Sequence, residues 1–363
     1  AKQPARVAIV VNDITRPTPY DLMLPPLLEE LREAGLKADQ ITLVVATGSH
    51  RAHTPEENRR SFGTEVAENY RIISHDCNAP DLVAVGKLGD GTELIINKEV
   101  AQADMVITTG LITLHYIAGF SGGRKSILPG VAARHLIQQS HAMMVDPRAR
   151  TGNYPDNPVH LRMLEAARLA GVDFILNVVT NEQKQIVEVV AGEVEQAWLK
   201  GVEVCARLNM LNLKEPADVA IACAGGAPKD INLYQAQKAM DAAAAAVRPG
   251  GTIILVAKCP EGLGEHTFER WLDEATCLQD IFDHFDRGFE LGGHKAFAIA
   301  QVLRDKEVVL VSDLGREVTA KLYMTYAPDL EWAIHYVNRK HGTQYSCYVM
   351  PQAGMIFPEV LNN

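Results

Sequence analysis

Residues 6–17 read RVAIVVNDITRP, and they set a pattern that the rest of the chain repeats. The segment 6–11 is short, mostly apolar and rich in β-branched residues, which is typical of a buried strand in a parallel sheet. Pro17 prevents this strand from continuing. Leucines then recur at helical spacing, at Leu24, Leu27, Leu28 and Leu31. With Gly35 after them, they predict a helix over about residues 20–34.

Strands and helices are predicted to alternate through the first part of the chain. Further strands are predicted at about 41–46, 71–74, 92–96, 105–109, 173–179 and 186–190. Helices are predicted at about 131–143, 157–170 and 193–209. Because parallel strands are joined by crossover helices, this alternation predicts a parallel sheet with helices on both faces.

A second domain is predicted after residue 210. Residues 210–216, MLNLKEP, are predicted to form a linker, and the strand–helix pattern restarts behind them. Strands are predicted at 217–222, 252–257, 307–311 and 346–350, and helices at about 232–247, 267–275, 293–304, 315–322 and 328–340. We therefore predict an α/β protein with two domains, 1–210 and 217–363. Each is a mostly parallel sheet flanked by helices, with the active site in the interdomain cleft.

The composition argues against several classes of protein. With 363 residues and 47% hydrophobic content, the chain is long enough for two domains with full cores. Its net charge of −10, without a basic stripe, argues against a nucleic-acid partner. No apolar run approaches the roughly 18 residues of a membrane span, and no signal peptide is visible. Six cysteines without a CxxC pair suit a reducing cytosol, so we expect a cytoplasmic protein.

Polar groups follow the first two predicted strands. Asp13 and Arg16 come just beyond the first strand, at the edge where ligands of open α/β sheets bind. Arg16 can hold a carboxylate or phosphate through two parallel bonds, although an Asx-turn with a surface charge explains the same residues. His50, in TGSHR at residues 47–51, follows the second strand, and its imidazole can exchange protons near neutral pH. A histidine bonded to nearby backbone is an equally good interpretation.

The segment GFSGGRKS at residues 119–126 nearly matches a nucleotide P-loop, GxxxxGK[ST]. Arg124 stands where that motif requires glycine, and its side chain is expected to obstruct the wrap of backbone amides around phosphates. Residues 121–123, Ser-Gly-Gly, can still receive one phosphate group through backbone N–H donors. Lys125 is then a phosphate partner or, if its amine is uncharged, a nucleophile. The apolar residues 127–129 argue against a merely solvated lysine.

Further candidates lie on both sides of this turn and in the second half. His115 and His141 are ten and sixteen residues from Lys125, which is not a zinc-binding spacing, so a bound metal would take few ligands from the protein. His141 is equally explained as a cation at a helix end. Tyr234, Gln235 and Lys238 are spaced to share one face near a helix start, as a ligand-binding wall or a solvated face.

Taken in order, these motifs resemble the nickel-pincer lactate racemase family. The match comprises Asp13 to Arg16, TGSHR at 47–51, His115, SGGRKSILPG at 121–130, His141 and YQAQK at 234–238. Each motif is weak alone, whereas the full set in this order is specific. The resemblance implies an isomerase, a racemase or epimerase of 2-hydroxy acids: lactate, a longer 2-hydroxy acid or a sugar acid.

The resemblance also implies a cofactor and residue roles. Family members use nickel(II) pyridinium-3,5-bisthiocarboxylate mononucleotide, a nickel-pincer nucleotide joined to a lysine, which here is Lys125. His141 is implied as the nickel ligand that completes a near-planar site of one carbon, two sulfurs and one nitrogen. His50 and His115 are implied as paired catalytic acid/bases. The implied cofactor contacts are Asp13, Ile14, Thr15 and Arg16, and the implied substrate contacts are Arg16, Tyr234, Gln235 and Lys238.

The implied reaction is reversible hydride transfer between the substrate and the cofactor, which avoids removing the weakly acidic Cα proton. One histidine takes the hydroxyl proton as the hydride leaves, and the other returns a proton after the planar keto acid reorients. Two bases on opposite sides of the substrate match its two enantiomers.

The chain also departs from the family pattern. Members commonly carry a further amino-terminal segment, whereas twelve residues precede Asp13 here. The type member has a second-domain tryptophan near the cofactor, and His294 or Phe297 is expected in its place. Two alternatives are a P-loop-like ATPase or kinase and a non-catalytic binding protein of the same fold. The expected partner is a small 2-hydroxy acid, without nucleic acid or membrane, and a homo-oligomer is left open.

Overall fold

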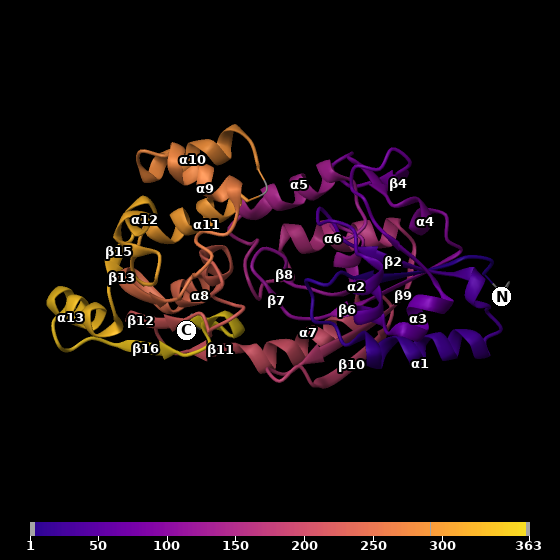
Figure 1. Ribbon diagram of the computed structural model, residues 1–363, viewed down its shortest axis with the longest axis horizontal. Coiled ribbons are helices and arrows are strands. Elements are labelled where there is room, and N and C mark those ends of the chain that lie inside the picture. The colour runs from indigo at the N-terminus through magenta and orange to yellow at the C-terminus, as the bar shows by residue number, and fades with distance from the viewer. Residues whose placement is uncertain (1–3, 291, 361–363) are drawn as a thin grey trace. The chain divides into compact units, whose positions relative to one another are not determined.

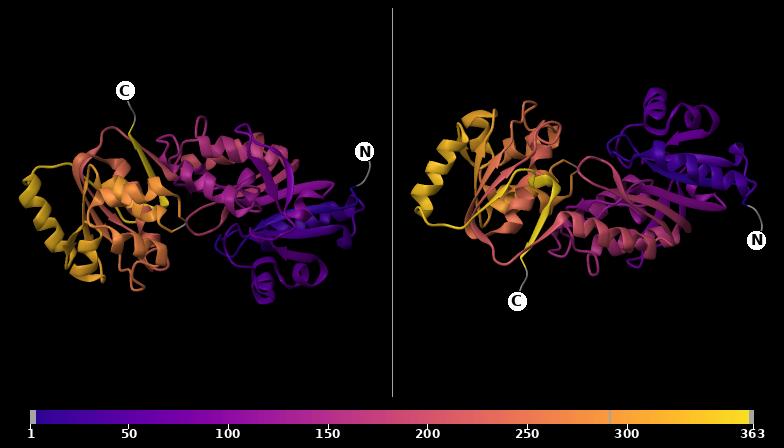
Figure 2. Two further views of the ribbon diagram at one scale, coloured as in Figure 1. Left: turned by 90° about the horizontal axis from the view of Figure 1, so that it is seen from above. Right: turned by 90° about the horizontal axis from the view of Figure 1, so that it is seen from below.

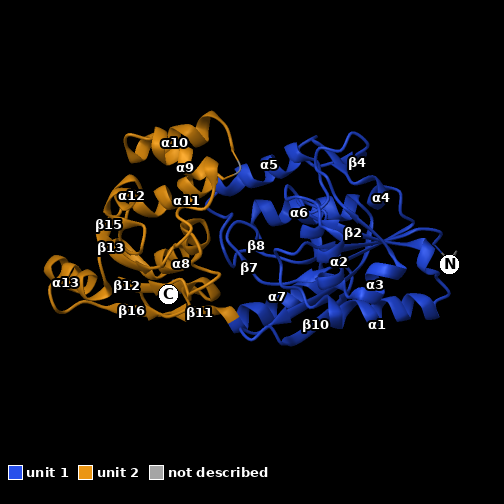
Figure 3. Cartoon of the chain, viewed as in Figure 1, with its two compact units in different colours: residues 1–208 blue, residues 209–363 orange. Residues whose placement is uncertain are grey.

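The chain folds as two α/β units, as the alternation of strands and helices predicts. The computed structural model describes residues 4–290 and 292–360. Its two compact units comprise residues 1–208 and 209–363 (Figure 3). Each unit is built on a mostly parallel sheet flanked by helices (Figure 1).

A six-stranded sheet forms the centre of the first unit. Its strands, in spatial order, are β10 (Ile186–Gly192), β9 (Val172–Thr180), β6 (Met105–Leu111), β1 (Val7–Asn12), β2 (Ile41–Ala46) and β3 (Arg71–Ser74). β1 pairs in parallel with both β2 and β6, whereas the edge strand β10 runs antiparallel to β9. The strands that follow β1 are added first on one side of it, as β2 and β3, and then on the other side, as β6 and β9. The strand order thus reverses at β1, and in such sheets ligands bind at the carboxyl ends of the strands next to this point.

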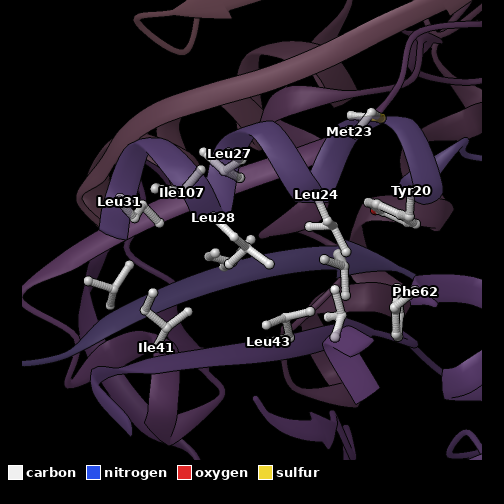
Figure 4. Close-up of a cluster of buried hydrophobic side chains, with 14 of the residues drawn as sticks. Tyr20, Met23, Leu24, Leu27, Leu28, Leu31, Ile41, Leu43, Phe62 and Ile107 are labelled. Atoms are coloured by element: carbon white, nitrogen blue, oxygen red, sulfur yellow. The ribbon is translucent and has the colours of Figure 1, made fainter. Parts of the chain in front are cut away.

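Helix α1 (Tyr20–Glu33) covers one face of this sheet. Four buried leucines of the helix belong to the same apolar cluster as the strand residues Ile41 and Leu43 (Figure 4): Leu24, Leu27, Leu28 and Leu31. Full burial of a leucine contributes about 1.5–3 kcal/mol, so this face is a large part of the core energy. The Tyr20 hydroxyl accepts a hydrogen bond from the Asn12 amide, which joins the start of the helix to the end of β1.

Shorter elements surround the main sheet of the first unit. The helices are α2 (Pro55–Phe62), α3 (Thr64–Asn69), α4 (Lys98–Ala101), α5 (Arg134–Ala142), α6 (Pro158–Leu169) and α7 (Gln196–Asn209), with short 3-10 helices η1 (Ala38–Gln40), η2 (Gly123–Ser126) and η3 (Met143–Val145). Two antiparallel pairs are β4 (Val83–Lys87) with β5 (Glu93–Ile96), and β7 (Leu114–His115) with β8 (Gly119–Phe120). The strand predicted at 92–96 therefore exists but lies outside the parallel sheet.

The second unit contains a five-stranded sheet in which every neighbouring pair is parallel. Its order is β15 (Thr325–Ala327), β14 (Glu307–Val311), β13 (Val247–Val256), β12 (Ala217–Cys223) and β16 (Cys347–Met350). Val219, Ile254 and Val309 share one apolar cluster with Ala333 and Val337 of helix α13 (Leu330–His341). One face of the sheet is thus covered by α13.

The other helices of the second unit are α8 (Leu233–Ala246), α9 (His266–Glu274), α10 (Leu278–Arg287), α11 (His294–Leu303), α12 (Gly315–Lys321) and the 3-10 helix η4 (Ala353–Met355), seen from two further sides in Figure 2. The close packing expected of the alanine-rich segment 239–246 is confirmed, because four of its alanines are buried in α8: Ala239, Ala242, Ala243 and Ala246. Small side chains allow this helix to approach β12 and β13 closely.

The linker prediction for residues 210–216 was wrong. Residues Met210–Leu213 form β11, which pairs in parallel with β17 (Phe357–Val360) near the carboxyl end of the chain. A lysine and a proline near 214–216 give this segment a loop-like composition, but a partner strand more than a hundred residues away supplies its hydrogen bonds. Helix α10 and strands β4, β15 and β17 were also not predicted.

Two observations bear on the setting of the protein. No helix within residues 4–290 and 292–360 combines the length and apolar content needed to span a membrane. All six cysteines are free thiols: Cys77, Cys205, Cys223, Cys259, Cys277 and Cys347.

Candidate functional site

The loops that follow β1, β2 and β6 carry the predicted site residues of the first unit. Asp13 follows β1, His50 follows β2, and the segment from His115 to Lys125 follows β6. The Gly48 amide donates a hydrogen bond to the Gly130 carbonyl at 2.9 Å, so the loop of His50 is tied directly to the loop of Lys125. Parallel pairing of the three strands places these loops at one edge of the sheet.

Asp13 and His50 form a carboxylate–imidazole pair. His50 Nδ1 lies 2.6 Å from Asp13 Oδ2, and the other carboxylate oxygen accepts hydrogen bonds from the Thr15 amide and hydroxyl. Burial alone would raise the pKa of Asp13, but the bonds from His50 and Thr15 outweigh it and hold the pKa below its ordinary value. The carboxylate therefore receives Nδ1–H and leaves Nε2 of His50 as the proton acceptor.

His53 supports the Asp13 loop, and the sequence reasoning missed it. Its Nε2 accepts a hydrogen bond from the Ile14 amide at 2.9 Å, while Nδ1 lies 3.1 Å from the Asn58 side-chain oxygen. Its ring also stacks on Phe62 of α2. His53 comes three positions after His50. A second histidine in the same loop was the one feature of the sequence that could have indicated its role.

Arg16 and Thr15 are exposed at the rim of this loop. Arg16 donates to the Thr15 carbonyl and hydroxyl oxygens at 3.3 and 3.2 Å. Both acceptors are neutral, so the Arg16 guanidinium can still form a stronger, charge-assisted hydrogen bond to an anionic group. Its positive charge also acts on Asp13 and on His115.

The glycine turn ahead of Lys125 is not a phosphate cradle. The Gly123 amide donates to Asn177 Oδ1 at 2.7 Å, and the Ser121 amide donates to the Thr113 carbonyl at 2.8 Å. Both N–H groups are thus used inside the protein. The proposal of a phosphate bound by residues 121–123 is contradicted by these contacts, because a cradle needs such groups directed at the ligand. A Cβ at Gly122 would also overlap the Ile112 side chain.

Arg124 fills the space that the turn encloses. Its side chain is fully buried, and each of its five N–H groups has an acceptor. The acceptors are Nδ1 of His160 at 2.8 Å and the carbonyls of Ala118, Phe120, Ser121 and Gly122 at 3.0–3.2 Å. The guanidinium also stacks 3.8 Å from the centre of the Trp198 ring. Burial lowers the pKa of Arg124 to about 9.

The inward position of Arg124 corrects the interpretation of the near P-loop match. Its side chain was expected to block a phosphate from outside, whereas it organises the turn from within. Trp198 assists, because its Nε1 donates to the Ser121 carbonyl at 2.8 Å. With Arg124 and Ser126 both buried, the half-buried Lys125 between them is the residue that η2 presents outward.

His115 is held in one tautomer by the backbone. Its Nδ1 accepts the amides of Ile117 and Ala118 at 3.4 and 3.2 Å, so the neutral ring carries its proton on Nε2. The pKa of His115 lies well below its ordinary value, first because of desolvation and then because of the positive charge of Lys125. The charges of Arg16 and His141 act in the same direction.

His141 lies in the last turn of α5, as predicted. Its Nδ1 is 2.8 Å from the Ile137 carbonyl and donates to it, so Nε2 carries the ring's lone pair. Desolvation, the largest influence, and the charge of Lys125 lower the pKa of His141 to about 4, against the opposing effect of the Ile137 bond. A neutral imidazole with one oriented lone pair is the form that binds a metal ion.

In the second unit, two of the three predicted substrate residues share a face. Lys238 donates to Gln235 Oε1 at 2.9 Å, one turn apart on α8. Tyr234 packs in a different direction, against the rings of Phe268 and His294. Burial raises the pKa of the Tyr234 hydroxyl to about 12.

The sequence matches two protein domains that together cover most of the chain. Residues 1–152 match the lactate racemase N-terminal domain, and residues 213–357 match the lactate racemase C-terminal domain. The chain belongs to the lactate racemase family. A lactate racemase from Thermoanaerobacterium thermosaccharolyticum is 39% identical over 336 residues, which cover 90% of this chain and 78% of that protein. A lactate racemase from Lactiplantibacillus plantarum is 36% identical over 356 residues, 95% of this chain and 83% of that protein.

One solved structure supports the same relationship within the lactate racemase family. The lactate racemase apoprotein from Thermoanaerobacterium thermosaccharolyticum superposes with a TM-score of 0.93 at 35% identity, covering 98% of this chain and 87% of that one. A Thermotoga maritima protein at 19% identity, with a TM-score of 0.69, shares the fold.

The residues of the first unit fit the cofactor that the family resemblance implies. Among the described residues, no group of three or more His, Cys, Asp or Glu side chains is placed to hold a metal ion. His141 offers a single oriented Nε2 donor, and Lys125 offers an amine whose charge reaches both His141 and His115.

Proposed function

We propose that this lactate racemase family member is an isomerase that interconverts the enantiomers of a short 2-hydroxy acid such as lactate. The observation that carries the proposal is the arrangement in the first unit. Two imidazoles in different tautomers, His50 and His115, accompany an outward-presented Lys125 and the metal-competent His141. The similarity to proteins named lactate racemase supports the same function.

The proposed cofactor is a nickel-pincer nucleotide joined to Lys125. When bound, it would supply a hydride acceptor and donor for the substrate Cα. His141 would hold its nickel through Nε2, since the Ile137 carbonyl fixes the other ring nitrogen as a donor. Asp13, Ile14, Thr15 and Arg16 are the proposed contacts for the rest of the nucleotide, because they form the loop beyond β1.

His50 and His115 are proposed to move the hydroxyl proton. His50 takes it at Nε2, and the Asp13 carboxylate on Nδ1 stabilises the imidazolium that forms. His115 returns a proton from Nε2 to the carbonyl oxygen of the keto acid. The amides of Ile117 and Ala118 that bond to Nδ1 keep this proton on Nε2. In the reverse direction the two residues exchange these tasks.

Binding of the substrate carboxylate is proposed to rely on positive side chains. Arg16 carries a fork-shaped guanidinium at the exposed rim of the Asp13 loop. Gln235 and Lys238 offer an amide and an ammonium on one face of α8. Tyr234 is proposed to shape the neighbouring surface, since its ring packs against Phe268 and His294.

We also infer a reducing, cytoplasmic setting from the free cysteines.

The test combines intact mass with polarimetry. Protein produced in a strain that makes the cofactor should show a mass adduct that is absent from Lys125→Ala and present in Lys98→Ala, an exposed lysine paired with Asp81. His50→Ala and His115→Ala should each lose interconversion of lactate enantiomers while their circular dichroism is retained. Active protein of unmodified mass would rule out the tether, and full activity of either histidine variant would remove that residue from its role.

A further inference from the structure

The second unit contains a small cavity beside the start of α8. Three polar side chains line it, those of Lys229, Gln235 and Lys238, and its other lining residues are alanines and a glycine. The cavity has a volume of about 60 Å³. A site needs roughly 10–15 Å³ of such space to hold one water molecule, so this cavity has room for a small polar group such as a carboxylate.

Lys229 is positioned for this cavity by the turn that follows β12. Its amide donates to the Gly226 carbonyl at 2.8 Å, and its side chain passes over Gly225. A Cβ on Gly225 would lie 3.5 Å from Lys229 Cδ and 3.7 Å from Nζ, on a residue whose φ of +93° already favours glycine. The turn therefore places the lysine stem over Gly225, and the ammonium reaches the Gln352 side chain.

The bond that Lys229 makes in this structure is one that an anion can replace. Nζ donates to the neutral Gln352 Oε1 at 3.3 Å, which is long for a lysine hydrogen bond. A hydrogen bond to a carboxylate is shorter and roughly twice as strong as one to a neutral group. Exchanging the Gln352 amide for a carboxylate oxygen would thus strengthen the contact of the ammonium.

The carboxylates near this cavity hydrogen-bond to other groups, and the charge of Asp241 also acts on Lys238. Asp230, next to Lys229, accepts the Lys258 amide at 3.2 Å. Asp241 accepts the Gln237 side-chain amide at 2.5 Å, and Gln237 in turn accepts Lys295 Nζ at 2.7 Å inside the unit. No acidic side chain is among the described residues that line the cavity. The lining thus combines two cations and one amide donor, which suits an anionic guest.

We propose that this cavity receives the carboxylate of the substrate, with Lys229 as a second cation opposite Lys238. The inference rests on the proposed function and adds Lys229 to the binding residues. Gln235 bonds Lys238 and offers its amide N–H groups to the same guest. Two ammonium groups around one carboxylate select acids over the corresponding neutral amides, because an uncharged group cannot compensate the two cations.

The experiment compares Lys229→Gln with Lys258→Gln in the full-length, cofactor-loaded enzyme. Lys258 is an exposed lysine on the loop after β13, so it controls for loss of a surface charge. Lys229→Gln should raise the KM for lactate at least about tenfold with kcat changed less, whereas Lys258→Gln should leave both unchanged. Calorimetric titration with lactate, lactamide and inorganic phosphate then tests the charge requirement, and Lys229→Gln should lose the preference for lactate over lactamide.

Each result separates this inference from the proposed function. If the wild type binds lactate through Lys229 but does not interconvert its enantiomers, the racemase function fails and the carboxylate site stands. If the wild type is active and Lys229→Gln matches Lys258→Gln in KM, the carboxylate site is refuted and the function stands. If Lys229→Gln loses phosphate binding while its KM for lactate is unchanged, the cavity serves a phosphate group and the inference is overturned.

Discussion

His160 makes a sharp prediction about the pH dependence of stability. It is buried, its Nδ1 accepts Arg124 Nε at 2.8 Å, and its ring stacks 4.7 Å from Trp198. Desolvation and then the charge of Arg124 lower the pKa of His160 to about 3, from an ordinary value of 6.5. Above pH 6.5 His160 is neutral in both the folded and the unfolded protein, and its stabilising contribution is complete. Between pH 6.5 and about 3 the unfolded protein binds a proton at this residue and the folded protein does not, so stability is lost as the pH falls.

The size of this loss follows from linkage. Each proton bound by the unfolded state and not by the folded state changes the free energy of unfolding by about 1.4 kcal/mol per pH unit. Between pH 7 and pH 4.5 His160 should thus contribute a loss on the order of 2–3 kcal/mol. In His160→Gln the amide oxygen can still accept Arg124 Nε, but the side chain does not titrate. The variant should lose that much less stability over the same interval.

Urea unfolding at several pH values measures this difference. Fluorescence of Trp198 reports on the first unit if Trp271 and Trp332 are replaced by phenylalanine in every protein compared. Since other buried histidines contribute equally to both proteins, the difference between wild type and His160→Gln isolates this residue. The exposed His135→Gln serves as the control and should follow the wild type. Parallel curves for wild type and His160→Gln from pH 7 to 4.5 would refute the assigned charge state.

Three further predictions concern the loops of the first unit. Asp13→Asn should lower kcat at least about 100-fold by polarimetry, because His50 loses the partner that fixes its tautomer; a kcat within twofold of wild type would contradict this. Arg124→Gly makes the sequence match the P-loop motif in full. The variant should nevertheless lose roughly 3–5 kcal/mol of unfolding free energy in urea, since four carbonyls lose their donors. ATP should give it no thermal stabilisation. Gly130→Ala places a Cβ against the Ser126 carbonyl and should lose about 1–3 kcal/mol, so an unchanged melting temperature would argue against the described loop.

The main sheets were predictable because their signals are local. Runs of β-branched residues identified β2 and β3 with their observed bounds, and the leucine spacing identified α1. β11 was missed for the opposite reason. Its pairing partner β17 begins at Phe357, so no window of neighbouring residues contains the information that makes it a strand.

The candidate site was predictable in its residue types and less so in its contacts. Asp13 and His50 were each expected just beyond a buried strand, but their 2.6 Å contact was not predicted. The inward direction of Arg124 was not predictable, because its acceptors are backbone carbonyls and Nδ1 of His160 on a distant helix. The directions of these carbonyls depend on the backbone conformation of the turn, which cannot be read from the order of the residues.

The turn around Arg124 inverts the polarity of a nucleotide-binding loop. Such a loop points amide hydrogens at an anion that arrives from solution, so part of its ordering waits for the ligand. Here carbonyl oxygens surround a cation that is covalently part of the chain. The conformational entropy of the turn is therefore lost during folding, so Lys125 is carried by a turn that is ordered before any ligand arrives.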